Sequence, residues 1–405
     1  MRPLSPRVAV AAMLSAVLLI TTPSLSASAV ARPDRVGLVS FVGASLTSSG
    51  ATLSIDWKAV PGATKYEVFA SPSFAALPKK TTPSLTVTNS RATLTKLDRG
   101  RDYYVQVRAV NSAGPAYRSL RVGHRTITAQ AKLPTTAPRY RALTWNVCSY
   151  DCPRFSTRAK VVNKRIAELK PDLIGLQEAS KYTKAPRGYA FAYDGQNDIL
   201  VRSSAFTKVK KNTKGATSGY VVAGSRYARA GKGFAWAALK HRSGQYVVAF
   251  DIHLLVGTSG ANLRQREYEA SRVNPFIQRT LARLARSHGS LTDWENAAVI
   301  VLGDVNSQKS RTNDDTLRIL EKSGWHDAFD QARSLTRQHH NSANPDWKTR
   351  PVIGTLWGAH VDKVLVRPSR SVVYSWENAG KLVDGKYVAP LGSDHHPVLV
   401  EVGLK

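Results

Sequence analysis

The sequence predicts an α/β domain that follows a smaller all-β domain. Residues 35–127 contain short runs in which apolar and polar positions alternate, with turn-forming pairs such as Pro61-Gly62 between them, as is typical of a β-sandwich. From residue 139 to 405, strand-like runs alternate with stretches of helical periodicity, which indicates an α/β domain. Residues 128–138, which include Pro134 and Pro138, are expected to link the two.

Residues 1–29 have the pattern of an export signal. Arg2 and Arg7 precede an apolar run from Val8 to Ile20, and Ala27-Ser28-Ala29 offers small residues for cleavage. The apolar run is shorter than the roughly 20 residues that a membrane span needs. We therefore expect cleavage after Ala29 and a secreted, extracellular mature protein without a transmembrane segment.

Aromatic residues in the all-β part follow a recognisable spacing. Trp57 precedes Pro61-Gly62 and Tyr66, and Tyr103 begins the last long strand-like run. This spacing resembles that of a fibronectin type III domain, in which Tyr103 would form the tyrosine corner, a hydroxyl bonded back to the backbone. Taken singly, Trp57 and Tyr103 would be ordinary core residues, and neither interpretation implies chemistry.

The α/β part is expected to contain one long helix with a buried face. Val273, Ile277, Leu281 and Leu284 form an apolar stripe at helical spacing, and Pro275 should kink or interrupt the helix. In order along the chain, we expect a strand at 140–147, a helix at 157–169, strands at 173–176, 234–239 and 246–253, the long helix at 263–288, and strands at 298–302, 361–366 and 398–402.

Polar residues stand where these strands end. Asp304 and Asn306 follow the apolar run 298–302, and Asp394 and His395 precede the run 398–400. A charge at the end of a buried strand is costly to desolvate unless a metal, a partner or a substrate compensates it, so the sequence predicts a site here. The same holds for the polar residues that end the other strands, which are Asn146, Glu178, His253 and Asp362.

Six segments, taken together, resemble a known superfamily. They are Trp145-Asn146-Val147, Leu176-Gln177-Glu178, Asp251-Ile252-His253-Leu254, Gly303-Asp304-Val305-Asn306, Val361-Asp362-Lys363-Val364 and Ser393-Asp394-His395-His396-Pro397. In this order they resemble the endonuclease/exonuclease/phosphatase superfamily, which includes pancreatic-type deoxyribonucleases, bacterial sphingomyelinases and inositol polyphosphate 5-phosphatases. The resemblance covers residues 139–405 and implies a deoxyribonuclease I-like fold, a four-layer α-β-β-α sandwich, for this domain.

The resemblance implies a metal site. Glu178 would be the principal ligand, with Asn146 and Asp394 near the same ion or its waters. These oxygen donors suit a hard cation that keeps several waters, which favours Mg²⁺ or Mn²⁺ over zinc.

The resemblance also implies which residues transfer protons and which bind the phosphate. His395 would activate water as a general base or hold the scissile phosphate, with Asp362 accepting its second ring proton. His253 would face the leaving oxygen as an acid or phosphate ligand, and Asp304 with Asn306 would position the attacking water and the phosphate. In-line attack on a phosphodiester requires such proton transfer and charge neutralisation.

Two departures from the family pattern limit this transfer. The residue before the strand histidine is usually Thr or Ser, and here it is Ile252. The segment 195–214, where family members place substrate-facing residues, matches only at Asn197-Asp198, so no ligand is assigned there. Asp251 remains open between an ordinary strand carboxylate and a partner of the site.

Cys148 and Cys152 are the only cysteines of the chain. In an exported protein, such a pair favours a disulfide over two free thiols or a metal site. The loop that it closes is short, so the effect would be local and would fix the turn that follows Asn146.

Three further histidines are not assigned to the chemistry. His396 is expected to point into the fold rather than toward the metal. His339 and His340 lie in a polar stretch and are expected in a solvated loop, where phosphate contact stays an alternative.

The formal charge of +30 limits the partners. Without Arg2 and Arg7 of the export signal it is +28, which favours anionic partners such as nucleic acid, anionic lipid or cell-wall polymer. Basic residues at 208–214 and 226–232 flank Tyr220 and Tyr227, an arrangement that can track a phosphate backbone and that a solvated surface explains nearly as well.

The function that the sequence favours is magnesium-dependent hydrolysis of extracellular DNA, with RNA as a further substrate, by a monomeric enzyme. One alternative is a sphingomyelinase-like or inositol-phosphate-directed hydrolase, although no long hydrophobic hairpin for a membrane is evident. The other alternative is a protein that binds anionic polymers without catalysis.

Overall fold

The computed structural model describes residues 30–229 and 232–405. The expected export signal, residues 1–29, lies outside the described residues. Among the described residues, no helix is both long enough and apolar enough to cross a membrane.

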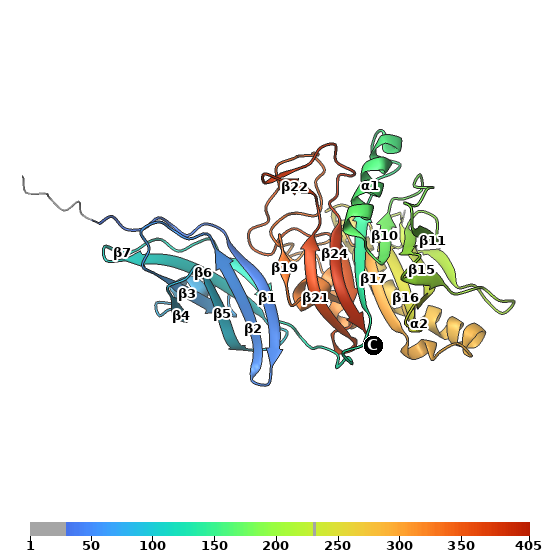
Figure 1. The fold of residues 1–405 in the computed structure, drawn as a ribbon, viewed down its shortest axis with the longest axis horizontal. Helices are drawn as coiled ribbons and strands as arrows, with labels where there is room; N and C mark the ends of the chain where they lie inside the picture. Colours follow the sequence, from blue (N-terminus) through green and yellow to red (C-terminus); the bar gives the residue numbers. More distant parts are fainter. Residues whose placement is uncertain (1–29, 230–231) are drawn as a thin grey trace, which may run out of the picture. The chain divides into compact units, whose positions relative to one another are not determined.

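The N-terminal part is a sandwich of two antiparallel sheets (Figure 1). The strands are β1 Val39–Thr47, β2 Gly50–Trp57, β3 Lys65–Ser71, β4 Leu85–Val87, β5 Arg91–Leu97, β6 Asp102–Asn111, β7 Gly114–Pro115 and β8 Val122–Arg125, with the 3-10 helix η1 Leu77–Lys79 after β3. One sheet has the order β1-β2-β5, and the other has the order β4-β3-β6-β7 with β8 paired to β6.

The aromatic residues of the sandwich lie as expected. The hydroxyl of Tyr103 accepts a hydrogen bond of 3.1 Å from the backbone N–H of Asp98, which is the bond of a tyrosine corner. Trp57 is buried and packs edge-to-face on Tyr66, with ring centroids 5.3 Å apart. Both residues therefore stabilise the core.

The C-terminal part contains two seven-stranded sheets. The first has the order β11-β12-β10-β9-β24-β21-β19, with bounds Tyr189–Tyr193, Asp198–Arg202, Leu173–Gln177, Arg139–Asn146, Val398–Leu404, Ser371–Asn378 and Leu335–Thr336. The second has the order β13-β15-β16-β17-β20-β18 with β14 paired to β15, with bounds Phe206–Lys208, Gly233–His241, Tyr246–His253, Ala298–Asp304, Asp362–Val366, His326–Asp327 and, for β14, Ser218–Val222.

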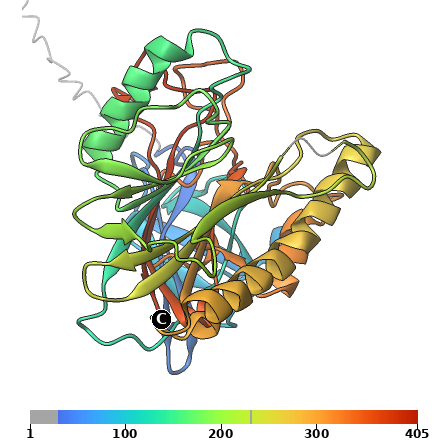
Figure 2. The same ribbon diagram turned by 90° about the vertical axis from the view of Figure 1, so that its right-hand side faces the viewer.

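Helices cover the outer faces of these two sheets. They are α1 Phe155–Leu169, α2 Gly260–His288 and α3 Thr316–Lys322. The short helix α4 Ala328–Gln331 is buried against β20 and β21. The remaining elements are the 3-10 helices η2 Trp294–Asn296 and η3 Pro368–Arg370 and a small hairpin of β22 Leu382–Val383 and β23 Lys386–Tyr387. Figure 2 shows α1 and α2 at separate places on the outside of the strands.

Three apolar cores lie between successive layers. Side chains such as Ala142 of β9 and Leu302 of β17 fill the space between the two sheets. A second core joins β15 and β16 to Ile277 and its neighbours on α2, and a third joins β9 and β10 to Ile166 and its neighbours on α1. The predicted four-layer α-β-β-α sandwich is therefore confirmed.

The long helix α2 begins earlier than predicted, and of the two predicted effects of Pro275 the interruption does not occur. It begins at Gly260, where the hydroxyl of Ser259 accepts a hydrogen bond from the N–H of Asn262. It also continues through Pro275 instead of being interrupted there. A proline removes one helical hydrogen bond, and the buried face that includes Val273 and Ile277 offsets this loss.

The segment after the sandwich and the stretch around His339 make close contacts within the fold. The N–H of Thr128 donates to the side-chain oxygen of Gln331 at 3.1 Å, and the N–H of Ala131 donates to the carbonyl of Ser371 at 2.9 Å. His339 is 4% exposed, with Nε2 2.9 Å from the carbonyl of Val39. The expectation of a solvated loop at His339 was wrong, because strand β1 covers it.

Candidate active site

The strand register brings the predicted site residues to one end of the two sheets. Strands β9 and β10 are parallel, with Asn146 opposite Gln177, so Glu178 follows directly beside Asn146. In the other sheet, β16 and β17 are parallel with His253 opposite Asp304, and Asp304 is opposite Asp362 on β20. Because the sheets pack face to face, residues from both meet at this edge.

Asp304 lies at the centre of this group. Its Oδ2 accepts a hydrogen bond of 3.1 Å from Nδ2 of Asn146 and lies 3.6 Å from Nε2 of His253 and 3.9 Å from Nε2 of His395. Burial, and then the nearby charge of Asp362, raises the pKa of Asp304 to about 7, although His395 acts in the opposite direction. A buried carboxyl group with this environment can exchange a proton near neutral pH.

His395 and Asp362 form a closely paired dyad. Nδ1 of His395 lies 2.9 and 3.1 Å from the two carboxylate oxygens of Asp362, which is fully buried. Burial alone would lower the pKa of His395, but the charge and hydrogen bond of Asp362 raise it to about 10. Asp362 therefore orients the ring and favours its protonated form.

The backbone around His395 is held by two side chains. The indole N–H of Trp145 donates to the carbonyl of His395 at 2.9 Å. The hydroxyl of Ser393 accepts from the N–H of His395 and donates to the carbonyl of Asn146 at 2.7 Å. These bonds tie the turn that carries His395 to the end of β9.

His253 is buried in a neutral form beside Asn306. Burial, and then the charges of Lys232 and His395, holds the pKa of His253 well below its usual value. Nδ2 of Asn306 lies 3.3 Å from Nε2 of His253 and also donates to the carbonyl of Leu254 at 3.0 Å. Asn306 has a positive φ of 50°, a left-handed conformation that asparagine adopts more readily than most residues.

Glu178 offers its carboxylate where several donors converge. Its Oε1 accepts hydrogen bonds from Nζ of Lys232 at 3.0 Å and from Nδ2 of Asn146 at 3.3 Å, and its side chain is 16% exposed. Nδ2 of Asn146 also donates to Asp304, so this one amide nitrogen contacts the carboxylates of both Glu178 and Asp304. The carboxylate of Glu178 fits a hard divalent cation as a ligand. The amide of Asn146 turns its Nδ2 toward this carboxylate while its Oδ1 accepts from the N–H of Cys148, so that Asn146 is a ligand stays a prediction.

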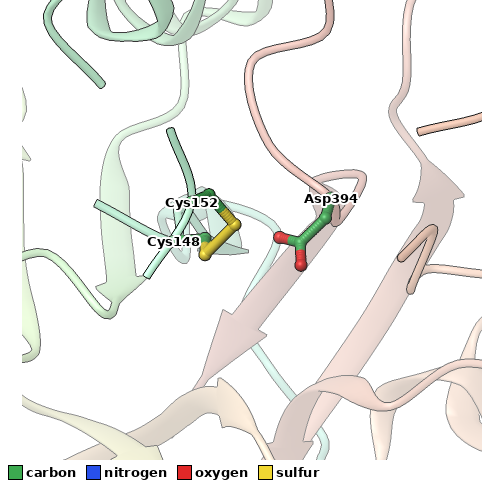
Figure 3. Close-up of side chains that lie close together, drawn as sticks. All are labelled: Cys148, Cys152 and Asp394. Atoms are coloured by element: carbon green, nitrogen blue, oxygen red, sulfur yellow. A yellow bond between two sulfur atoms is a disulfide. The ribbon is translucent and has the colours of Figure 1, made fainter. Parts of the chain in front are cut away.

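Asp394 lies beside the two cysteines. Figure 3 shows its carboxylate beside the disulfide, and its oxygen and the two sulfur atoms lie within 4.8 Å of one another. Cys148 and Cys152 form the predicted disulfide, so their sulfurs are not thiolates and this cluster is not a metal site. That Asp394 shares an ion with Glu178 stays a prediction.

The disulfide loop fixes the amide of Asn146. Oδ1 of Asn146 accepts a hydrogen bond of 3.0 Å from the N–H of Cys148, and Cys148 has a positive φ of 43°. The expected local role of the disulfide, at the turn after Asn146, fits this contact.

Arg158 was not predicted from the sequence. Its buried guanidinium donates five hydrogen bonds of 2.7–3.0 Å to backbone carbonyls, those of Val147, Cys148, Cys152, Pro153 and Gly392. It thereby joins the loop after β9 to the loop that precedes Asp394. A signal was present, because Arg158 stands four residues before Val162 and eight before Ile166, on the buried face of α1.

Asp251 is a buried strand carboxyl group that pairs with Gln177 of the other sheet. Its Oδ1 accepts a hydrogen bond of 2.6 Å from Nε2 of Gln177, across the two sheets, and burial raises its pKa well above the usual value. Asn197 donates to the carbonyls of Gly233 and Asp251. Asn197 and Asp198 are fully buried, and the amide nitrogen of Asn197 is used by these two carbonyls.

His396, next to the dyad, points into the fold as expected. It is 5% exposed and stacks on Tyr387 with ring centroids 3.6 Å apart. Burial lowers its pKa to about 3. Only His395 of this pair therefore contacts Asp362.

The geometry of the site agrees with a family comparison. The model of the Endonuclease/Exonuclease/phosphatase family matches residues 143–395, which is more than half of the chain. The chain belongs to this family. Its members hydrolyse phosphoester bonds and typically use divalent metals, which the oxygen donors at the strand ends suit. The Fibronectin type III domain model matches residues 39–122, and a search of curated proteins finds no match.

Solved structures with similar folds have low sequence identity. A family protein of Bacteroides thetaiotaomicron is 18% identical with a TM-score of 0.49, over 67% of this chain and 96% of that one. A mannosyl-6-phosphatase of the same species is 18% identical with a TM-score of 0.48, over 65% and 99%. The human Nocturnin catalytic domain is 15% identical with a TM-score of 0.44, over 66% and 96%.

Lys232 is expected to compete with a metal ion for Glu178, since Nζ of Lys232 and the ion would bind the same carboxylate. Lys232→Met should therefore tighten Mg²⁺ binding by about tenfold, which corresponds to about 1.4 kcal/mol. Titration calorimetry of the chelator-treated protein with MgCl₂ measures this. Lys210→Met, which removes an exposed lysine elsewhere on the surface, is the matched control. Equal affinities for wild type and Lys232→Met would contradict the competition.

Proposed function

We propose that this protein is a secreted, metal-dependent phosphodiesterase whose leading substrate is extracellular DNA, with RNA as a further substrate. The observation that carries the proposal is the convergence of an oriented His–Asp dyad, a second histidine and an oxygen-donor group at one edge of two sheets. These residues are His395, Asp362, His253, Asp304, Asn306, Glu178 and Asn146.

Each residue of this group has its own role in the proposed hydrolysis. His395, held by Asp362, would donate a hydrogen bond to a phosphate oxygen. Asp304, within 4 Å of both histidines, would orient the attacking water and accept its proton. His253 and Asn306 would face the leaving oxygen. A magnesium ion bound at Glu178 and Asn146 would supply charge neutralisation at the phosphate.

A pocket beside His395 supports an extended polyanionic substrate. It has a volume of about 270 Å³ and is lined by Trp145 and Tyr387 and by the basic side chains of Lys160, Lys164 and Arg165. The aromatic residues are buried and form the floor of the pocket, and the basic groups beside them can hold neighbouring phosphates of a strand. The formal charge of +30 also favours the binding of a polyanion.

Export is part of the proposal. The arginines and the apolar run of residues 1–29 support it, and so does the disulfide Cys148–Cys152, since disulfides persist in oxidising compartments.

One observation favours the lipid-directed alternative. Val222, Tyr227 and Val256 are exposed, and the first two lie on the segment that leads to Lys232, which contacts Glu178. Exposed apolar residues near a site are what an enzyme of a membrane surface would use. Sphingomyelin and phosphoinositides are therefore included in the test.

The test is a substrate panel with purified residues 30–405. Plasmid DNA, RNA, sphingomyelin vesicles and phosphoinositides are incubated with MgCl₂ or with chelator, and the products are quantified. We expect cleavage of DNA that the chelator abolishes. Cleavage of a lipid alone would show that the proposed substrate is wrong. Retention of DNA without cleavage of any substrate would contradict the enzymatic function itself.

A further inference from the structure

The contacts of Lys309 point to a role for the fibronectin type III domain in the active site. We propose that Asp102 and Arg125 of this domain are positioning residues, which hold the loop after Asn306 through Lys309. The proposal rests on the proposed function of the site, because Asn306 is one of its residues.

Lys309 is bound to the fibronectin type III domain by an ion pair. Its Nζ lies 2.9 Å from Oδ1 of Asp102 on β6 and 3.5 Å from the carboxylate of Asp330. It also lies 4.2 Å from the ring centre of Trp357. The Asp102 and Lys309 side chains are only 28% and 21% exposed, so water screens their pairing less than it would on an open surface.

Arg125 completes this network from the neighbouring strand β8. It donates to Asp102 at 2.8 Å and to Glu321 at 2.6 Å, at the end of α3. Burial would raise the pKa of Asp102, but Lys309 and Arg125 together lower it to about 2, so this carboxylate stays charged at neutral pH. Arg125 of the fibronectin type III domain and Lys309 of the C-terminal domain thus both pair with the carboxylate of Asp102.

The same loop is bound to the catalytic residue at its other end. The guanidinium of Arg311 donates to the carbonyl of Asn306 at 2.6 Å, and the N–H of Arg311 donates to the carbonyl of Gln308 at 3.0 Å. Asn306 lies in this turn with a positive φ of 50°, and its amide contacts His253. Displacement of Lys309 would therefore be transmitted through a short turn to Asn306.

The domain surface around Asp102 is packed closely enough to act as a fixed support. The N–H of Gly123 donates to the carbonyl of Leu356 at 2.8 Å, and a Cβ at Gly123 would lie 2.9 Å from the ring of Trp357. His124 is fully buried between Phe41 and Phe329, with ring centroids 5.2 and 4.9 Å away. Such packing resembles a protein core and leaves the loop little freedom to shift.

The test uses Asp102→Asn in the full chain and two independent measurements. Misplacement of Asn306 should lower kcat about tenfold with KM changed less than about twofold, because the loop positions the reacting groups and is not assigned to substrate binding. Amide hydrogen exchange in the peptide covering residues 304–312 should become about tenfold faster, because local opening becomes easier. Asp102→Glu should recover most of both.

Glu67→Gln is the matched control, since it removes a carboxylate that pairs with Arg108 at 2.6 Å within the same domain. It should leave kcat and the exchange of residues 304–312 unchanged. Wild-type values of both quantities in Asp102→Asn, or equal losses in Glu67→Gln, would overturn the proposal. An inactive wild type would overturn the proposed function instead, while hydrogen exchange would still test the support of the loop.

Discussion

Replacement of His395 by glutamine is expected to lower kcat by a factor of about 10²–10⁴ while the affinity for DNA stays within about threefold. The ring of His395 is oriented by Asp362 at 2.9 Å and approaches Asp304, so its loss removes a proton donor at the reacting phosphate. The DNA contacts of a polycation are distributed over many side chains, so binding should persist. Turnover and fluorescence anisotropy with the same oligonucleotide measure the two effects.

His396→Gln is the control that separates chemistry from local structure. His396 is the next residue along the chain, but it stacks on Tyr387 and does not contact Asp362. This variant should lower the melting temperature and keep kcat near the wild-type value. If both variants lost activity equally, the loss would reflect a disturbed turn, and His395 would have no specific role.

The site could be predicted from sequence where strand ends determine side-chain positions. His253 and Asp304 each end a buried strand, and parallel pairing then places them opposite one another at 3.6 Å. The order of the six segments supplied the family, and with it the pairing of Asp362 with His395. Local sequence patterns and family order were enough because these residues lie on regular strands.

The contacts that the sequence did not predict depend on long-range packing. Lys232 belonged to a recognised basic cluster, but its bond to Glu178 arises because two strands from different sheets end at the same edge. The burial of His339 against β1 and the ion pair of Lys309 with Asp102 join residues more than 200 positions apart. No local periodicity reports such pairs, since they depend on how the domains pack.

Arg158→Met is expected to cause the largest loss of stability among the variants considered. Carbonyls that lose a donor and stay buried cost about 1–3 kcal/mol each, so the melting temperature should fall by about 10 °C. Activity should fall as well, because Arg158 joins the carbonyls of Val147 and Gly392, which stand next to Asn146 and Ser393. Thermal unfolding and kcat at 20 °C, below the transition, separate the two losses.

Arg367→Met is the matched control. The guanidinium of Arg158 lies 5.1 Å from the ring centre of Phe155, and that of Arg367 lies 4.7 Å from the ring centre of Trp325 but donates a single bond, to Asn274. The control variant should lower the melting temperature by a few degrees and leave kcat unchanged. Arg158→Lys should give an intermediate result, because one ammonium group cannot reach all of the carbonyls that the planar guanidinium joins. A stable, fully active Arg158→Met would show that the two loops keep their places without this side chain. The disulfide Cys148–Cys152 and the hydroxyl of Ser393 would then have to hold Asn146 in position.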